Sequence, residues 1–443
     1  MSGRSPRSDT TLQRLRRYES RNVTFQEADG SWPIVWSKAR GTRVTDADGR
    51  RYLDLTAAFG VAAAGHANPR VVRAGARQMG TLLHAMGDVH PHPLKADLAQ
   101  ALSRLTFERW TRRTRSRAEG KSVFGTSGSE AVEVALKTAR LATGKPGIIA
   151  FSGGYHGLGY GALNATHREL FRGPFLNQLR EFGHFVAFPE VGTSKALDGM
   201  EAAIRRLART HSVGAILAEP IQARGGIRIP PPGFLRRLRS LADALGAVLI
   251  LDEIYTGFGR TGLWFACEHE SVVPDLICLG KALTGGFPLS ACVGKADLMD
   301  RAWPPSAGEA IHTSTYLGHP VGCAMALAQI AEIESRQLVQ ASALRGRELM
   351  KGLTTLARRA GSIRRRVRGI GLMAGIELRH ADGRPATTES IAVMKELLRR
   401  GLIVLPEGAD SEVISFTPPL TLSSTELKRT LRILGEVLET CVP

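Results

Sequence analysis

The sequence predicts an α/β fold with a mostly parallel central sheet flanked by helices. Residues 247–251 form an apolar, β-branched run with the length of a buried strand, and residues 276–279 form a second, shorter run. The first run ends on Asp252, and the second ends on Gly280 and Lys281. Because parallel strands end at one edge of a sheet, where α/β proteins bind ligands, we expect Asp252 and Lys281 to face one crevice.

Helical and strand patterns alternate through the rest of the chain. A hairpin is expected where residues 42–44 and 52–55 flank an Asp-Ala-Asp-Gly turn. Further strands are expected at residues 121–124, 148–151, 215–218, 367–378, 402–405 and 413–416, and helices at 69–86, 95–105, 132–141, 235–245 and 321–334. This alternation is typical of a layered α/β protein.

The composition restricts the classes of protein to which the chain can belong. The 443 residues, of which 43% are hydrophobic and 23% charged, suit a soluble globular chain with more than one domain. No apolar run has transmembrane length, and the basic residues 1–17 lack the apolar segment of a secretory signal. The five cysteines are odd in number and have no metal-ligand spacing, which predicts no metal site and a reducing, cytoplasmic location.

The net charge of +18 allows two interpretations. Arginines are scattered over helix-like segments, which favours solvated helix faces. A nucleic-acid or other polyanion surface is the alternative, but aromatic residues rarely interleave with the arginines. We therefore expect neither a nucleic acid nor a membrane as partner.

Lys281 also has two interpretations. A lone lysine after a strand is more often a surface residue. Gly280-Lys281, however, precedes Ala-Leu rather than a charged helix face, and a lysine amine at such a site can form a Schiff base with a carbonyl cofactor. Pyridoxal 5'-phosphate (PLP) needs that lysine, and it needs an acid at its pyridine nitrogen so that the ring works as an electron sink. Asp252 and Lys281 supply this pair.

At this point a family resemblance becomes specific. Residues 252–262 read Asp-Glu-Ile-Tyr-Thr-Gly-Phe-Gly-Arg-Thr-Gly, and Pro274-Asp275 and Gly280-Lys281 follow. This pattern resembles the class III, or ω-, aminotransferases of the fold type I PLP enzymes, and the resemblance extends from about Gly41 to about Leu420. It implies a fold type I PLP-transferase with a large domain (76–334), a smaller α+β domain (335–443) and an N-terminal segment packed against the latter (31–75). The polar residues 1–30 are expected to form a flexible arm, with a weak targeting segment as the alternative.

The resemblance also implies the activity. A primary amine or amino acid, of the ω-amino type, would give its amino group to a keto-acid acceptor through a Schiff base on Lys281. The freed lysine would then act as general base. The alternative on the same scaffold is a PLP racemase, epimerase or other non-transaminase, and an alternative of another class is a polyanion-binding protein that keeps the fold for structure alone.

Further cofactor residues are implied by position. The loop Ser127-Gly128-Ser129 opens a helix and resembles the phosphate cup of the family, since a helix N-terminus presents free N–H groups to an anion. Tyr155 matches the aromatic residue that lies against the pyridine ring, and Glu219 opens the family's Glu-Pro-Ile-Gln element. His156, which follows Tyr155, is either a cofactor-site residue or a packed structural histidine.

Two more positions concern the partner subunit and the substrate. Thr315 matches a threonine that in relatives reaches the PLP phosphate of the neighbouring subunit, which implies a homodimer with shared active sites. Phe59 falls where relatives have a substrate-facing aromatic residue, and the other interpretation is core packing.

Three positions depart from the family pattern. Ser415 replaces an arginine that many glutamate-using relatives carry, Arg224 replaces the glutamate that pairs with it, and Tyr255 stands where Gln or Val is frequent. Glutamate and 2-oxoglutarate are therefore in doubt as substrates. We expect Arg224 to bind an acidic group of the substrate or acceptor, with a solvent-facing side chain as the alternative.

Overall fold

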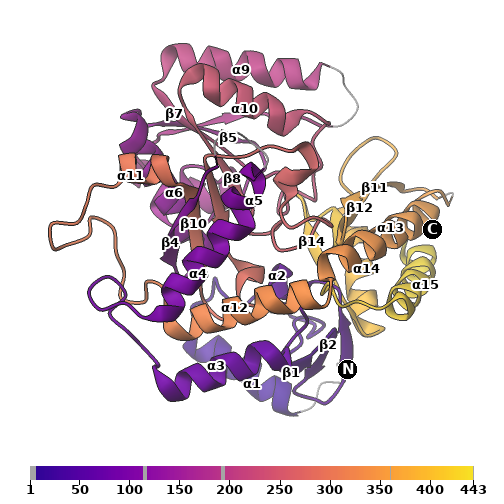
Figure 1. Ribbon diagram of the computed structural model, residues 1–443. Helices are drawn as coiled ribbons and strands as arrows, with labels where there is room; N and C mark the ends of the chain where they lie inside the picture. Colours follow the sequence, from indigo (N-terminus) through magenta and orange to yellow (C-terminus); the bar gives the residue numbers. More distant parts are fainter. Residues whose placement is uncertain (1–5, 113–116, 191–194, 360, 443) are drawn as a thin grey trace.

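The computed structural model describes residues 6–112, 117–190, 195–359 and 361–442 (Figure 1). Its centre is a seven-stranded sheet with the strand order β4-β10-β9-β8-β7-β5-β6. The strands are, in chain order, β4 (Gly120–Gly125), β5 (Gly147–Phe151), β6 (Gly183–Val186), β7 (Val213–Ala218), β8 (Val248–Asp252), β9 (Leu276–Leu279) and β10 (Ser290–Lys295). Only β10 runs antiparallel to its neighbours, so the predicted α/β fold with a mostly parallel sheet is confirmed.

Strand β8 explains how this sheet is buried on both faces. Val248 and Ile250 pack in a cluster with α6 (Gly128–Thr143), whereas Leu249 and Leu251 pack in the cluster that includes α10 (Phe234–Leu245). Successive side chains of a strand point to opposite faces, so a strand covered on both sides needs an unbroken apolar run. This is why the sequence pattern at residues 247–251 predicts the strand.

Further helices of the first 335 residues surround the large sheet. They are α2 (Ala57–Gly60), α3 (Pro69–Thr81), α4 (Pro93–Ser103), α5 (Arg109–Thr111), α7 (Tyr160–Leu163), α8 (Glu169–Arg172), α9 (Ala196–Thr210), α11 (Ala296–Ala302) and α12 (Pro320–Ser335). Helices α3 and α12 pack side by side below the sheet in Figure 1. No helix in the described part of the chain combines the length and apolarity needed to cross a membrane.

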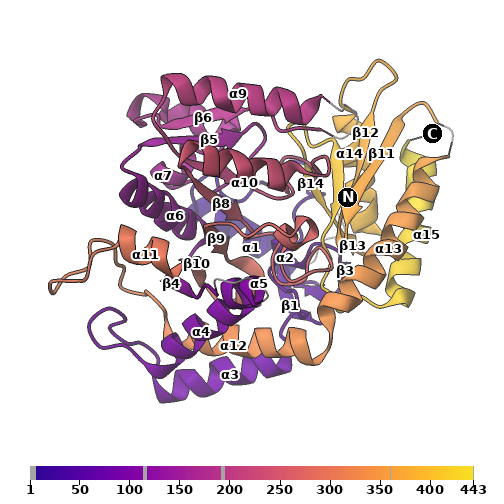
Figure 2. The same ribbon diagram turned by 45° about the horizontal axis from the view of Figure 1, so that its top comes forward.

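A second sheet lies to one side of the first (Figure 2). Its order is β11-β12-β15-β14, from β11 (Arg364–Ile370), β12 (Met373–Arg379), β14 (Leu405–Glu407) and β15 (Val413–Phe416). Helices α13 (Leu338–Ala357) and α14 (Thr387–Arg399) pack against it, and α15 (Ser424–Cys441) packs on these two helices. A third sheet joins β1 (Trp36–Arg40), β2 (Arg43–Asp46) and β3 (Arg51–Asp54) to β13 (Leu402–Ile403), which ties the N-terminal hairpin to the C-terminal part.

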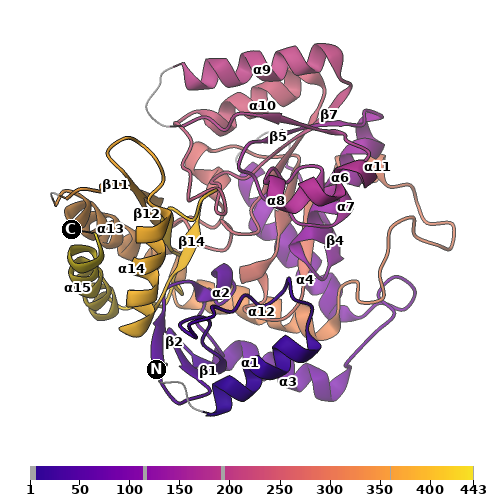
Figure 3. The same ribbon diagram turned by 180° about the vertical axis from the view of Figure 1, so that it is seen from behind.

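Four local predictions are wrong. Residues 402–405, expected to be one strand, are divided between β13 and β14 of different sheets, and the helix expected at 69–86 ends at Thr81. Residues 6–18, expected to be part of a flexible arm, form helix α1 (Pro6–Tyr18), which lies against the β2–β3 turn through a hydrogen bond from the Ser8 amide to Asp48 (3.3 Å) (Figure 3). The helix buries Leu12, which is 2% exposed, and residues 1–5 of the arm lie outside the described residues. Residues 367–378, expected to be one strand, form the hairpin of β11 and β12, because Gly371 reverses the chain at a φ of 58°.

Candidate active site

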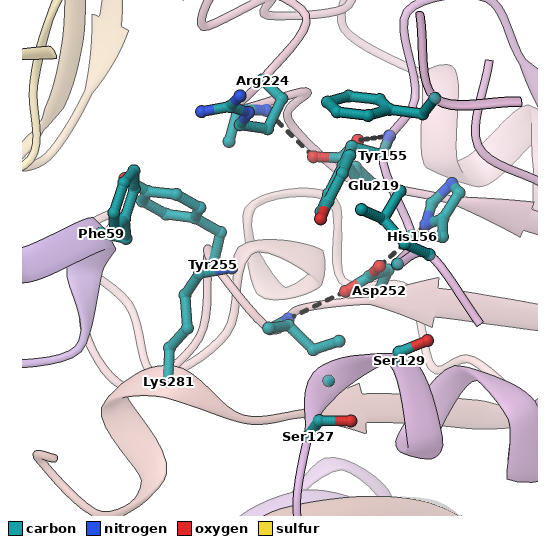
Figure 4. Close-up of a pocket in the computed structure, with 16 residues that line it drawn as sticks. Phe59, Ser127, Ser129, Tyr155, His156, Glu219, Arg224, Asp252, Tyr255 and Lys281 are labelled. Carbon is teal, nitrogen blue, oxygen red and sulfur yellow. Dashed lines mark hydrogen bonds and ion pairs between the residues drawn. The ribbon is translucent and has the colours of Figure 1, made fainter. Parts of the chain in front are cut away.

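A pocket of about 610 Å³ opens at the carboxyl ends of β8 and β9 (Figure 4). Ten of the eleven residues predicted for the site line it: Phe59, Ser127, Gly128, Ser129, Tyr155, His156, Glu219, Arg224, Asp252 and Lys281. They come from segments far apart in the chain, and the sheet brings them together. The pocket is the crevice that the positions of Asp252 and Lys281 predict.

Asp252 is the buried acid of the pocket, at the last position of β8. Its Oδ2 atom lies 2.8 Å from Nδ1 of His156, and its Oδ1 accepts a hydrogen bond from the Ile254 amide at 3.1 Å. Burial alone would lower the pKa of His156, but the hydrogen bond to Asp252 and the charges of Asp252 and Glu219 raise it. The imidazole thus fixes the orientation of the Asp252 carboxylate.

Lys281 follows β9 after a single residue, Gly280, and points into the pocket (Figure 4). Its backbone has a φ of 41°, a left-handed conformation that is uncommon for a residue with a side chain. Burial lowers the pKa of its amine, against the opposing effects of Asp252, Glu219 and Glu407. An amine with a lowered pKa more readily loses its proton and becomes a nucleophile.

The Ser127–Ser129 loop forms the opposite end of the pocket from Arg224 (Figure 4). Ser127 is the N-cap of α6, and its hydroxyl accepts a hydrogen bond from the Glu130 amide at 3.3 Å. A methyl group on Gly128 would lie 2.9 Å from Cδ1 of Ile254, so the loop packs closely on the segment after Asp252. The N–H groups of Gly128 and Ser129, at the start of this 16-residue helix, bond no residue in the described ranges and are available to an anion.

Glu219 supports the wall that carries Tyr155. Its two carboxylate oxygens accept hydrogen bonds from the amides of Tyr155 and Ala223, each at 3.0 Å. Burial raises the pKa of Glu219 to about 7. The Tyr155 ring lies in the pocket between this carboxylate and Asp252 (Figure 4).

Phe59 lies at the mouth of the pocket. It belongs to a turn in which Ala57, Ala58 and Phe59 all have positive φ (48°, 49° and 62°). Asp54 holds the turn by accepting hydrogen bonds from the amides of Thr56 (2.8 Å) and Ala58 (3.2 Å). Because Phe59 remains 49% exposed, it is not packed in the core, and its ring is available to a ligand.

Arg224 lies above the Tyr155 ring, with its guanidinium carbon 5.9 Å from the ring centroid. Its Nε is 3.7 Å from Oε2 of Glu407 on β14, and the two side chains are 29% and 1% exposed. Ser415 takes no part in this contact, since its hydroxyl donates to the Leu405 carbonyl at 3.1 Å. Glu407 is a functional candidate that the sequence reasoning missed.

Thr315 is the one predicted site residue outside the pocket. It is exposed in the long loop between α11 and α12, which projects to the left in Figure 1. Within one chain the structure does not bring Thr315 together with Ser127 or Ser129.

Other residues of the 252–262 motif hold the structure together. Glu253 accepts hydrogen bonds from the amides of Ala266 (2.8 Å) and Cys267 (2.7 Å), and burial raises its pKa to about 7. Arg260 is fully buried and donates to the Leu372 carbonyl at 3.0 Å, at the β11–β12 turn. These two residues fix the glycine-rich loop between the large sheet and the C-terminal sheet.

The comparisons with known proteins decide the family. The model of the family described as aminotransferase class-III matches residues 24–438. The chain belongs to this family. It is 35% identical to a putrescine aminotransferase of Pectobacterium atrosepticum (92% of this chain, 82% of the relative). It is 34% identical to a 5-aminovalerate aminotransferase of Pseudomonas aeruginosa (92% and 94%).

Solved structures of the family share the fold. A transaminase from the marine bacterium Virgibacillus superposes with a TM-score of 0.88 at 26% identity, covering 98% of this chain and 99% of that one. An amine transaminase from an uncultivated Pseudomonas species, solved in a PLP-bound form, gives 0.85 at 29% identity (95% and 98%). Class III aminotransferases depend on PLP, so this protein is a PLP-dependent aminotransferase, and the racemase alternative is not favoured.

The pocket of this class III aminotransferase fits PLP by its own chemistry. It holds an amine, Lys281, together with a buried carboxylate, Asp252, and a helix N-terminus suited to a phosphate. These three features match the aldehyde, the ring nitrogen and the phosphate of the cofactor.

Proposed function

We propose that this aminotransferase moves an amino group from a terminal (ω) amine to a keto-acid acceptor, with Lys281 as the residue that bonds PLP. The observation that carries the proposal is the pairing of β8 with β9. These strands are parallel neighbours with Asp252 opposite Cys278, so Asp252 and the lysine three residues beyond Cys278 open into one pocket. The pair supplies the nucleophilic amine and the acid that PLP chemistry needs.

When bound, PLP supplies an aldehyde to which amines add and a ring that accepts electrons from the substrate carbon. Asp252, oriented by His156, would keep a proton at the ring nitrogen. Lys281 would carry a proton to and from the substrate carbon as general base and acid.

The other pocket residues would bind the cofactor. Ser127, Gly128 and Ser129 would hold the phosphate at the N-terminus of α6. The Tyr155 ring would stack on the cofactor ring, and Glu219 keeps Tyr155 in place by accepting its amide hydrogen. His156 would act through Asp252 rather than on the substrate.

For the substrate we propose a terminal amine whose far end, or whose keto-acid partner, carries a carboxylate. Arg224 would bind this carboxylate from the wall that Glu407 supports, and Phe59 would cover the apolar part of the substrate at the pocket mouth. The names of the relatives agree with a terminal amine, because putrescine and 5-aminovalerate both have one.

We further propose a cytoplasmic homodimer. Large apolar side chains are exposed along α3 and the loops at the ends of α4 and α12, among them Val72, Met79, Leu83, Met86, Val89 and Tyr316. A second copy of the chain covering this face would bury them, and Thr315 would reach the cofactor phosphate of the partner. All five cysteines are free thiols, which supports a reducing compartment.

Two experiments test the proposal. Borohydride reduction of the holoenzyme followed by peptide mapping should find the cofactor on Lys281, and Lys281→Ala should abolish turnover, whereas Lys295→Ala, at a lysine paired with Asp275 outside the pocket, should not. A panel of terminal amines and α-amino acids, read by loss of the absorbance of the lysine-bound cofactor, should favour the terminal amines. A label on another lysine, or loss of optical activity without a carbonyl product, would refute it.

A further inference from the structure

Tyr255 is the aromatic residue next to the proposed cofactor lysine. It is buried in the pocket wall, and its ring centroid lies 4.5 Å from Nζ of Lys281. Figure 4 shows the two side chains approaching from different segments, Tyr255 from the loop after β8 and Lys281 from the end of β9. Lys281 makes no hydrogen bond or ion pair with a residue in the described ranges, so the ring is the specific contact of its amine.

The Tyr255 ring is held in place by its hydroxyl. The Tyr255 oxygen lies 3.2 Å from Oγ1 of Thr417, and Thr417 donates its only hydroxyl hydrogen to the Thr56 carbonyl at 3.1 Å. The phenol must therefore donate to Thr417. Burial raises the pKa of Tyr255 to about 12, which agrees with a phenol that keeps its proton.

A close backbone contact restricts the ring from another direction. A methyl group on Gly60 would lie 3.0 Å from Cε1 of Tyr255, so the glycine allows the ring to pack tightly on the N-terminal segment. Gly60 also has a φ of 80°, which a residue with a side chain would rarely adopt. The ring is thus fixed at its hydroxyl end by Thr417 and along its edge by Gly60.

This geometry has a consequence for Lys281. The face of an aromatic ring carries negative potential and attracts an ammonium group within about 6 Å of its centroid. The charged groups that act on Lys281 are Asp252, Glu219, Glu407 and Arg224, and burial disfavours its charged form. The ring offsets part of the free-energy cost that burial imposes on the charged amine, because it stabilises the protonated amine without adding a charge.

We propose that Tyr255 is a positioning residue that holds the free amine of Lys281 against its ring whenever the amine is not bonded to the cofactor. The lysine is then kept inside the pocket, close to where it takes up and returns a proton, instead of swinging away on its flexible stem. This inference rests on the proposed role of Lys281.

The test uses the full-length protein freed of cofactor, to which PLP is added at a series of pH values. The rate at which the lysine-bound cofactor absorbance appears depends on the neutral fraction of the amine, so the midpoint of the profile reports its pKa. The titration of PLP itself is common to all variants and cancels in their differences. Tyr255→Leu removes the ring, and Tyr255→Phe keeps the ring while removing its hydrogen bond to Thr417.

We expect Tyr255→Leu to move the midpoint down by about 0.4–1.5 pH units, the shift that corresponds to the usual range of a cation–π contact. Tyr255→Phe, which keeps the ring but frees its hydroxyl end, should give a smaller shift in the same direction. If Tyr255→Leu does not fold, Thr417→Val, which frees the ring, should give a smaller shift in the same direction. Equal midpoints in all the folded variants would overturn the role of Tyr255.

Peptide mapping of each reduced variant separates the two proposals. Cofactor on a lysine other than Lys281 would refute the proposed function. Cofactor on Lys281 with an unchanged midpoint would refute only the inference about Tyr255.

Discussion

Arg224 and Glu407 approach each other across the pocket wall, with 3.7 Å between Nε of the guanidinium and Oε2 of the carboxylate. The distance is longer than a hydrogen bond, and Glu407 Oε2 is buried without a hydrogen-bond partner among the described residues. Arg224 is therefore loosely held through Nε, and its terminal nitrogens, which bond no residue that the structure describes, can bind a carboxylate in the pocket. The charges are opposite to those of the Glu–Arg pair that the family resemblance implies at this wall.

This arrangement predicts selectivity for acidic substrates. Arg224→Ala should lower kcat/KM roughly 10- to 150-fold for a donor or acceptor with a distal carboxylate. This factor corresponds to a loss of about 1.5–3 kcal/mol of transition-state stabilisation, because a charged hydrogen bond is lost. Matched neutral amines should change little. Arg228→Ala is the control, since Arg228 pairs with exposed Glu190 and does not line the pocket. Equal losses for acidic and neutral substrates would mean that Arg224 is structural.

Glu407 predicts a dependence of stability on pH. Burial raises its pKa from an ordinary value of 4.5 to about 7, although Arg224 opposes the shift. The folded protein holds the proton more tightly than the unfolded chain does. The contribution of protonated Glu407 to the free energy of unfolding is therefore fully present below about pH 4.5, and it is lost as the pH rises through about 7.

Glu407→Gln removes this titration. From pH 5 to pH 8 the free energy of unfolding of the cofactor-free variant should fall less than that of the unchanged protein, by up to roughly 3 kcal/mol. Glu190→Gln, at the exposed Arg228–Glu190 pair, should leave the pH dependence unchanged. Denaturant titrations at several pH values measure this free energy of unfolding. If it changes with pH equally in Glu407→Gln and Glu190→Gln, Glu407 does not titrate as a buried group.

The orientation of Asp252 by His156 predicts an effect on proton transfer. Asp252→Asn should retain the cofactor but slow single-turnover conversion by about 100-fold or more, because the charge that favours a proton on the ring nitrogen is removed. His156→Phe should give a smaller loss, since the carboxylate stays. Asp275→Asn is a control, because Asp275 pairs with Arg239 and Lys295 away from the pocket. A normal rate in Asp252→Asn would mean that another group protonates the ring.

The sequence predicts the parts of this site that follow from local patterns. Asp252 and Lys281 close apolar runs, and Ser127 precedes an amphipathic helix, so their place in the fold follows from strand and helix ends. Glu407 leaves no such signal, because Leu-Pro-Glu-Gly resembles an exposed turn and the contact with Arg224 depends on how two distant segments meet. The Tyr255–Thr417 hydrogen bond could not be predicted for the same reason, because it joins two distant segments, one from the large sheet and one from the C-terminal sheet. Helix α1 escapes prediction because its packing on the β2–β3 turn cannot be read from its polar sequence.

The exposed position of Thr315 leads to a test of the shared active site. A protein with Lys281→Ala lacks the lysine in both sites of a dimer, and one with Thr315→Ala lacks the threonine in both. If Thr315 serves the partner's cofactor, a mixed dimer has one site with both residues intact and one with neither. Co-expression should therefore give a mixed dimer with about half the activity of the unchanged enzyme per dimer, above the sum expected from the separate parents.

The control for this experiment is the same mixture made with Ser129→Ala, at a residue that lines the pocket of its own chain together with Lys281. There the mixed dimer has one site without the lysine and one without the serine hydroxyl, so no site is complete and no activity should be regained. Cofactor affinity gives a second measurement, because Thr315→Ala should weaken PLP retention in the dimer. If the Thr315 mixture behaves like the Ser129 mixture, each site is complete within one chain, and the exposed loop that carries Thr315 has another role.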